Sequence, residues 1–440
     1  MTRETHDWDA LIEADRVHRS IYTDPDIFAL EMQRIFESTW IYVGHTSQVS
    51  LPGDFVTARV GRQPVIVTRH RDGEVHVLYN RCAHKGAQVV SERCGRVKAF
   101  RCSYHGWGYD TDGRLIAVPA EQGYEGTRFC RQNAEARLQG VARVGIYRGF
   151  IFASLVAEGP DLETWLKGVD SSIDNLVDRS AQGELEIVGG VLRYEVQANW
   201  KFHVENLNDT LHPMVTHQSS SQTARSVAAR HVAPDSPLPA VVQIISPFTN
   251  KYSFFDAMGI TVFEHGHSYT GGRISIHSAY SDIPEYYAQL EAAYGPERTR
   301  EILSINRHNT VIYPSLTLKG AIQTIRVVTP LAVDRTLIES WTFRLKGAPQ
   351  ELLRRSVLYC TLINSSGGLV QPDDHEAYIR MQRGLNCTAS GNDWVSMHRY
   401  FGKETPTENA GLSALGTSDL ACRNQYRTWK QLMSAADAAS

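Results

Sequence analysis

Short runs of alternating apolar and polar residues follow one another between residues 54 and 152. "FVTARV" and "PVIVTR" have the two-residue period of strands, and "VHVLY" follows them after the turn sequence at residues 71–73. A second turn signal, Asp112-Gly113, lies in the same region. This pattern predicts a small all-β domain, which we place at residues 41–157.

A helical pattern precedes these strands in residues 21–40, "IYTDPDIFALEMQRIFESTW". Asp24 suits the N-cap and Pro25 the first helical position. Apolar side chains then recur on one helical face, at Phe28, Met32, Ile35 and Phe36. We therefore expect residues 1–40 to form a helical segment that packs on the larger domain described next.

Beyond Gly159-Pro160 the pattern is mixed. Helical periodicity near residues 161–178, in "EYYAQLEAAYGPERTREILSI" and in residues 350–385 alternates with strand-like runs. Those runs are "VLRYEVQ", "GGRISIHSAY", "HNTVIYPSLTLKG", "IQTIRVVTP" and "TLIESWTFRL". The sequence thus predicts an α+β fold, in which a larger domain at residues 158–440 has an antiparallel sheet with helices set against it.

Composition and charge are those of an ordinary globular protein. The chain has 440 residues, of which 42% are apolar and 21% are charged, and two domains fit this length. The net charge of −3 gives no indication of a nucleic-acid partner. The N-terminal residues lack the apolar core of a secretory signal, and no apolar run approaches the roughly 18 residues of a membrane span. We therefore expect no membrane partner and a cytoplasmic enzyme.

Two of the seven cysteines stand in a repeating cysteine–histidine pattern. The pairs are Cys82-x-His84 and Cys102-x2-His105. A structural zinc site usually pairs cysteine with cysteine and histidine with histidine. A Rieske [2Fe–2S] cluster instead needs two thiolates on one iron and two imidazoles on the other, so each pair would supply one ligand of each kind. The spacing predicts a Rieske cluster held by these four residues, with zinc as the alternative.

A second group of candidate ligands lies in residues 199–217, "NWKFHVENLNDTLHPMVTH". In a regular helix, His212 and His217 would point about 140° apart. Pro213 disfavours the α conformation at His212, so a break there would let the two imidazoles converge. Two neutral histidines and one carboxylate form the facial triad of mononuclear non-haem Fe(II), with positions open for O2. We therefore expect such an iron site, with its carboxylate supplied from another segment.

The carboxylate has several candidates. Asp373 and Asp374 lie where a turn enters a helix, and either would serve as a ligand or as a helix cap. Helical periodicity does not distinguish the two. Asp209 would act as a ligand itself, or it would accept the free N–H of His212 and so fix the orientation of that ring.

With these motifs in this order, the chain resembles the catalytic (α) subunit of a Rieske non-haem iron ring-hydroxylating oxygenase. The resemblance extends from residue 21 to residue 384 and includes the Asn-Trp-Lys sequence at residues 199–201. It implies that the larger domain is catalytic and that Asp374 is the carboxylate ligand. It also implies a homotrimer (α3, or α3β3 with a small β subunit), in which Asp209 forms an electron bridge to His105 of the next chain.

The same resemblance implies the electron donors and the substrate. Because the chain has no Gly-x-Gly-x2-Gly motif, electrons from NAD(P)H would arrive through a separate reductase, directly or through a ferredoxin. The chain resembles the benzoate, terephthalate and salicylate-type oxygenases, which have the three-residue spacing of Asn206 and Asp209. We therefore expect an aromatic carboxylate as the substrate. The alternatives are a Rieske-type monooxygenase or demethylase and an electron carrier without oxygenase activity.

Two further features bear on the substrate. Arg326 lies in a strand-like run, where it would bind a substrate carboxylate, form a structural ion pair or face solvent. The segment from His217 to Met258 is rich in Ser, Pro and Ala, and we expect it to form a mobile entrance loop.

Overall fold

The computed structural model describes residues 7–233, 235–276 and 283–438, which form two compact units. The small unit contains Met32–Trp165, and the large unit contains the described residues up to Glu31 together with those from Leu166 onward. The domain boundaries predicted after residues 40 and 157 stay predictions. The predicted α+β class, with a small all-β part and a larger part built on an antiparallel sheet, is confirmed.

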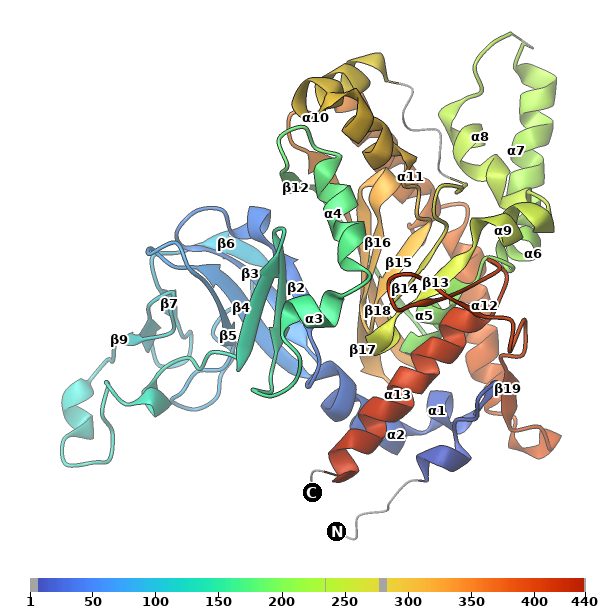
Figure 1. The fold of residues 1–440 in the computed structure, drawn as a ribbon. Helices are drawn as coiled ribbons and strands as arrows, with labels where there is room; N and C mark the ends of the chain where they lie inside the picture. Colours follow the sequence, from blue (N-terminus) through green and yellow to red (C-terminus); the bar gives the residue numbers. More distant parts are fainter. Residues whose placement is uncertain (1–6, 234, 277–282, 439–440) are drawn as a thin grey trace. The chain divides into compact units, whose positions relative to one another are not determined.

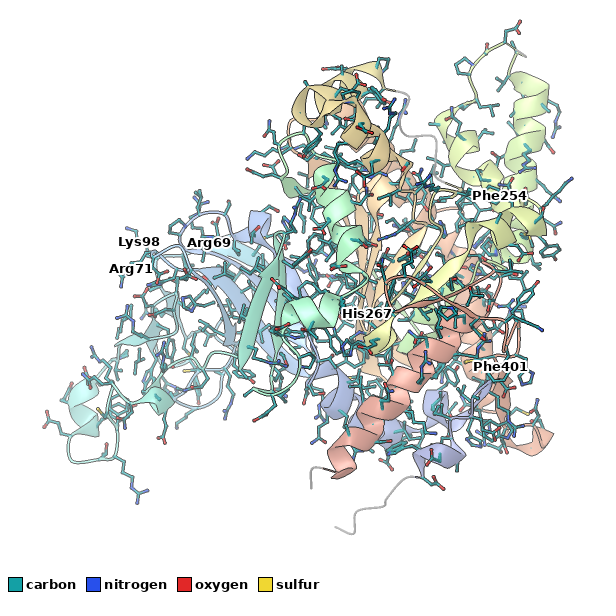
Figure 2. All side chains as sticks on the ribbon, in the orientation of Figure 1. Arg69, Arg71, Lys98, Phe254, His267 and Phe401 are labelled. Atoms are coloured by element: carbon teal, nitrogen blue, oxygen red, sulfur yellow. The ribbon has the colours of Figure 1, made fainter. Side chains whose placement is uncertain are left out.

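Three antiparallel sheets build the small unit (Figure 1). The four-stranded sheet has the order β5-β4-β3-β6, and its strands are β3 (Asp54–Val60), β4 (Gln63–Arg69), β5 (Val75–Tyr79) and β6 (Cys94–Arg96). The two three-stranded sheets contain β7 (Phe100–Arg101), β8 (Gly108–Tyr109) and β9 (Leu115–Ala117), and β2 (Ile41–His45), β10 (Arg143–Tyr147) and β11 (Phe150–Ser154). Apolar side chains of alternate strand positions, such as Phe55 and Ile66, meet in a buried core. Arg71 and Lys98 lie at the surface of this unit (Figure 2).

A nine-stranded antiparallel sheet forms the centre of the large unit, in the order β12-β18-β17-β16-β15-β14-β13-β21-β20. Its strands are β12 (Leu185–Val196), β13 (Ile260–Val262), β14 (Ser268–Thr270), β15 (Asn309–Ile312), β16 (Leu316–Lys319), β17 (Thr324–Ala332), β18 (Arg335–Leu345), β20 (Thr405–Pro406) and β21 (Leu412–Ala414). The middle strands β15, β16 and β17 are almost entirely buried, because helices pack against the sheet.

The helices that matter for the site are α5 (Trp200–Asn208), α6 (Pro213–Thr216), α7 (Gln218–His231), α11 (Gln350–Ile363), α12 (Gln371–Leu385) and α13 (Leu420–Ala438). Figure 1 shows α13 as a long helix with α5 beside it. None of the helices in the described part of the chain has both the length and the apolar character of a membrane span.

The helix predicted at residues 21–40 is present but interrupted. It consists of α1 (Ser20–Thr23), α2 (Pro25–Glu31) and a π-helical turn, and Asp24 caps α2 by accepting the backbone N–H of Asp26 at 2.8 Å. Glu31, at the end of α2, is fully buried in the large unit. Its carboxylate pairs with Lys201 Nζ at 2.5 Å and accepts Trp429 Nε1 at 2.7 Å. The buried charge of Glu31 therefore has a partner of opposite sign, which joins α2 to α5 and α13.

Two expectations from the sequence are wrong. The segment after His217, expected as a loop, forms α7, α8 (Ala240–Ile245) and α9 (Tyr252–Met258), which carries Phe254 (Figure 2). Its Ser and Ala residues are compatible with helix, and the described breaks between the helices lie near Pro239 and Pro247. The strand expected at residues 271–280 is also wrong for the residues that the structure describes. β14 ends at Thr270, and residues 271–276 form no strand; residues 277–280 lie outside the described residues.

Candidate metal centres

The two cysteine–histidine pairs lie in two loops of the small unit with the same backbone hydrogen bonds. In one loop Gly86 N donates to Cys82 O at 2.9 Å, and in the other Gly106 N donates to Cys102 O at 3.0 Å. Both glycines have a left-handed φ, 76° and 75°, which a side chain would strain. The loops follow β5 and β7, so the β unit holds two similar turns, each with a cysteine at its base.

The side chains of these two loops differ in how deeply they are buried. Cys82 and Cys102 are each 2% exposed and are not joined in a disulfide, whereas His105 is exposed. The two imidazole rings lie 4.5 Å apart between their centroids. The Nε2 atom of His84 contacts the Tyr124 hydroxyl at 3.3 Å, while its buried Nδ1 has no hydrogen-bond partner in the described chain. Two thiolates and two imidazoles with a free Nδ1 fit the ligand set of a Rieske [2Fe–2S] cluster.

The structure also identifies neighbours that the sequence pattern missed. The Tyr109 hydroxyl lies 3.1 Å from Cys82 Sγ and accepts the Ala83 N–H at 3.1 Å. Trp107 stacks on the His84 ring, with centroids 4.9 Å apart. Hydrogen bonds to cluster sulfurs and the orientation of ligand rings both influence such a centre. No motif pointed to Tyr109, because its contact depends on the pairing of β8 beside the loop.

In the large unit, His212, His217 and Asp374 are the candidate metal ligands that converge. One ligand atom of each lies within 4.8 Å of the other two. His212 Nε2 is 3.5 Å and His217 Nε2 is 3.3 Å from the same oxygen, Asp374 Oδ1. Burial raises the pKa of Asp374, but the hydrogen bond from His217 and the charge of His212 outweigh burial, so the pKa lies below its ordinary value. An ionised carboxylate between two imidazoles fits a divalent cation with open positions.

The backbone brings the two histidines together in a different way from the expected one. α5 ends before Asp209, which is extended, and His212 itself is in the α conformation at the start of α6. Pro213 occupies the first turn of α6, where its missing N–H has no consequence. The second bend lies at His217 (φ −103°, ψ 16°), between α6 and α7. The predicted convergence is therefore present, but the bends flank the Pro213 turn instead of lying at it.

Asp373 and Asp374, which helical periodicity did not distinguish, occupy different positions, and Asp374, to which the resemblance pointed, is the one beside both histidines. Asp374 is buried beside both Nε2 atoms, whereas Asp373 Oδ2 lies 3.1 Å from His217 Nδ1, on the far side of that ring. Asn206 was not expected in the site, and its Nδ2 lies 3.1 Å from both His212 Nε2 and Asp374 Oδ1. The geometry therefore makes Asp374 a candidate ligand and puts Asp373 against the opposite nitrogen of His217.

Asp209 lies apart from this group. Its carboxylate accepts the Leu211 N–H at 2.6 Å and is 3.5 Å from Arg399 Nη2. Among the described residues, no hydrogen bond joins the Asp209 side chain to His212, and Asp209 is not one of the three converging groups. The side chain of Asp209 is 27% exposed, so it is open to contact from outside the chain.

A small cavity of about 30 Å3 adjoins the triad. This is room for one or two waters, so an aromatic ring enters only if lining side chains shift. Its apolar lining includes Leu207, Phe248, Ile363 and Val370, and its polar lining includes His308, Asn309, Lys319, Arg326 and Gln371.

A second cluster of possible ligands and a larger hollow are explained by contacts within the chain. His70, Asp110 and Asp112 also form a cluster of possible ligands, but Arg71 and Arg114 lie 2.9 Å and 3.1 Å from Asp110 and neutralise it.

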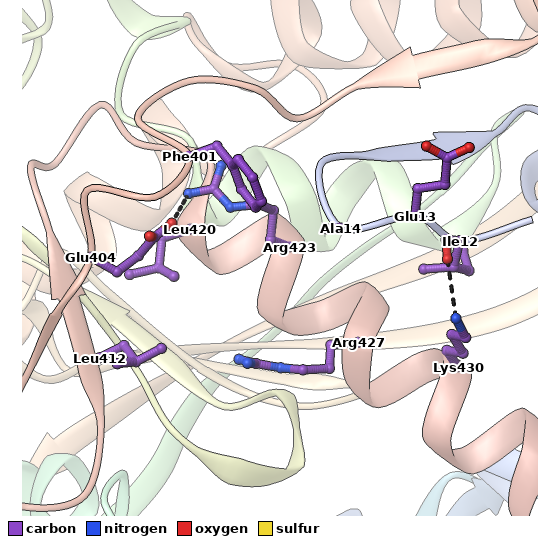
Figure 3. A pocket seen from close by; sticks show the side chains of 10 residues that line it. All are labelled: Ile12, Glu13, Ala14, Phe401, Glu404, Leu412, Leu420, Arg423, Arg427 and Lys430. Atoms are coloured by element: carbon purple, nitrogen blue, oxygen red, sulfur yellow. Dashed lines mark hydrogen bonds and ion pairs between the residues drawn. The ribbon is translucent and has the colours of Figure 1, made fainter. Parts of the chain in front are cut away.

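A larger hollow of about 450 Å3 lies beside α13 (Figure 3). Its three cations have partners within the chain: Arg423 bonds to Glu404 at 2.6 Å, Arg427 to the Asn424 side chain at 2.5 Å and Lys430 to Ile12 O at 3.2 Å. Each of these cations is therefore already held by a group of the chain itself.

A cysteine–histidine pair in each of two loops, together with a converging group of two histidines and a carboxylate, is the combination found in Rieske-type non-haem iron oxygenases. Residues 39–132 match the Rieske [2Fe-2S] domain, and residues 185–434 match the ring hydroxylating alpha subunit (catalytic domain). The chain is 34% identical over 442 residues to toluate 1,2-dioxygenase subunit alpha of Pseudomonas putida, with 97% of this chain and 94% of that protein covered. It is 30% identical over 443 residues to biphenyl 2,3-dioxygenase subunit alpha of Rhodococcus jostii (strain RHA1), with 97% and 90% covered.

Among solved structures, naphthalene 1,2-dioxygenase with indole bound in the active site has a similar fold. The TM-score is 0.80 at 24% identity, with 97% of this chain and 94% of that chain covered. The chain therefore belongs to the family of ring-hydroxylating oxygenase α subunits. It is an oxidoreductase, the terminal oxygenase subunit of a multicomponent system. Its cofactors are one Rieske [2Fe–2S] cluster and one mononuclear non-haem iron.

Proposed function

We propose that this α subunit hydroxylates an aromatic carboxylate with O2 and with electrons that come from NAD(P)H through a separate reductase or ferredoxin. The observation that carries the proposal is the convergence of His212 Nε2, His217 Nε2 and Asp374 Oδ1 in a buried pocket. The toluate dioxygenase relative supports an acid substrate, although the biphenyl dioxygenase relative is nearly as similar.

The ligand roles follow the geometry of the two centres. Cys82, His84, Cys102 and His105 would hold the Rieske cluster, and His212, His217 and Asp374 would hold the iron. When bound, the iron would supply oxygen activation and the cluster would supply stored electrons. Asp373 would keep the His217 ring oriented through Nδ1, so that Nε2 faces the metal. The apolar wall would keep water away from the reacting ring.

Asp209 would connect the two kinds of centre between chains. Its partly exposed carboxylate, with Arg399 beside it, would accept the ring N–H of His105 from a neighbouring chain in a head-to-tail trimer. The exposed position of His105 at the edge of its loop is compatible with this contact. A small β subunit would complete an α3β3 assembly, and we propose a cytoplasmic location.

Anaerobic purification followed by metal analysis tests the proposal. We expect about three irons per chain, two in the cluster and one in the triad, with the rhombic EPR signal of a reduced Rieske centre. With NADH and a compatible reductase, aromatic acids should then yield hydroxylated products that account for the O2 consumed. A colourless protein, or one with only the two cluster irons after iron loading, would contradict the proposal.

A further inference from the structure

Two cations lie in the interior of the large unit, on the sheet beside the triad. Lys319, at the end of β16, and Arg326, on β17, are each 5% exposed. In the register of these strands, Arg326 lies opposite Thr317, which is two residues before Lys319. Side chains two residues apart share a face, so Lys319 and Arg326 are diagonal neighbours on one face of the sheet. Both line the cavity that adjoins His212, His217 and Asp374.

In the described part of the chain, neither cation has a carboxylate within ion-pair distance. Arg326 Nη1 donates to Gln371 Oε1 at 3.3 Å, and Lys319 Nζ donates to the Tyr359 hydroxyl at 3.0 Å. Among the described residues, these are the hydrogen bonds of the two cationic groups, and no carboxylate lies within ion-pair distance. Lys201, another buried cation of the large unit, has Glu31 at 2.5 Å. A buried charge without a counter-ion is unfavourable, so this arrangement favours the binding of an anion.

A side-chain amide that lines the same cavity also lacks one hydrogen-bond partner among the described residues. The Gln371 Oε1 atom faces Arg326, while Gln371 Nε2 is buried without a hydrogen bond in the described chain. Burial, followed by the neighbouring Arg326 charge, lowers the pKa of Lys319 well below its ordinary value, as expected for an ammonium group that has no bound anion. The wall therefore offers three donors for the oxygens of a ligand, next to the apolar surface of Ile363 and Val370.

We propose that Lys319, Arg326 and Gln371 Nε2 form a binding subsite for the carboxylate of the aromatic substrate. This inference rests on the proposed function and names the residues that select an acid over a hydrocarbon. The carboxylate would bind on the sheet side of the cavity, and the ring would extend from it toward the triad, at the two ends of α6 and on α12. A neutral aromatic molecule would leave both cations unpaired, so the pocket would reject it.

Binding of benzoate and of benzamide, its neutral analogue of similar shape, tests the subsite. The iron-replete oxygenase is titrated with each compound in a calorimeter. We expect wild-type protein to bind benzoate at least about 100-fold more tightly than benzamide, because only the carboxylate pairs with the buried cations. Arg326→Gln and Lys319→Met should each reduce this ratio by at least about 10-fold. Arg326→Lys, which keeps the charge, should retain most of the preference.

Arg344→Gln is the matched control, since Arg344 is an exposed cation on the neighbouring strand β18, and it should leave the ratio unchanged. Equal affinity for both compounds, no benzoate binding by iron-replete wild type, or an unchanged ratio in Arg326→Gln would overturn the subsite. Iron content and the EPR signal of the same samples separate the two proposals. A wild-type protein that cannot hold the triad iron contradicts the oxygenase function, whereas an iron-replete protein without acid preference contradicts the subsite alone.

Discussion

The two candidate metal-binding regions of this chain differ in how far apart their ligands lie in the sequence and in how exposed they are. In the small unit, all four candidate cluster ligands lie between Cys82 and His105, in two similar loops, and the histidine edge is open to solvent. In the large unit, Asp374 comes from α12 while both histidines lie near α6, and the carboxylate is buried between the two imidazoles.

This difference corresponds to two chemical tasks. An electron store must exchange electrons with other proteins, so an exposed ligand edge shortens the path between centres. An oxygen-activating centre must keep water away from reactive species, so it lies deep and is assembled from distant segments. The local site can form from its loops and a small sheet, whereas the buried site depends on the packing of the whole large unit.

Asp374→Ala should have the largest effect and should affect only one of the two centres. We expect loss of the triad iron and of all turnover, while the Rieske EPR signal is kept, because the two centres share no ligand. Asp373→Asn should instead weaken iron affinity about 10–100-fold, the usual effect of a residue that orients a metal ligand. Metal analysis and EPR of both variants measure this, with exposed Glu376→Gln on the same helix as the control. Equal iron loss in both aspartate variants would contradict the assignment.

Asp209→Ala should abolish product formation while both metals stay bound, because Asp209 is proposed to connect centres and not to hold one. Single-turnover experiments with a reduced cluster would show whether electrons reach the iron. If the variant loses its mononuclear iron, Asp209 is a ligand and the proposed bridge is wrong.

Tyr109→Phe should change the small unit alone. The hydroxyl lies 3.1 Å from Cys82 Sγ, and a hydrogen bond to a cluster sulfur stabilises the reduced, more negative state. We therefore expect a lower reduction potential with unchanged iron content, measured by voltammetry. A potential equal to that of the wild type would mean that this hydroxyl does not donate to the sulfur.

Glu205→Gln should give the smallest effect, on stability. Burial raises the pKa of Glu205 to about 7, although the hydroxyls of Tyr426 and Tyr22 hydrogen-bond to it. Between pH 4.5 and about 7 the unfolded chain has lost this proton and the folded chain retains it, so wild-type stability falls as pH rises through this window. Glu205→Gln has no group that ionises here, so its stability does not fall in this way. The resulting difference between the free energies of unfolding of the two proteins should reach about 3 kcal/mol at most. Urea denaturation at several pH values measures it; parallel curves would show that Glu205 is ionised throughout.

Much of the fold was predictable because its signals are local. Alternating runs identified β3, β4 and β5, and four of the five strand-like runs of the larger domain correspond to β12, β15, β16, β17 and β18. The prediction of a loop after His217 was wrong, because small polar residues fit a helix as readily as a loop once tertiary packing holds them.

The sequence by itself determined the cysteine–histidine loops and the two histidines near Pro213, since each ligand set lies within one short segment whose spacing restricts its chemistry. Only the tertiary structure put Asp374 beside both histidines and Asp373 on the far side of the His217 ring, brought Asn206 between two ligand atoms and placed Lys319 and Arg326 in the same cavity. These relations join residues far apart in the chain, and they depend on helix packing and strand register. No local pattern encodes a distance between segments.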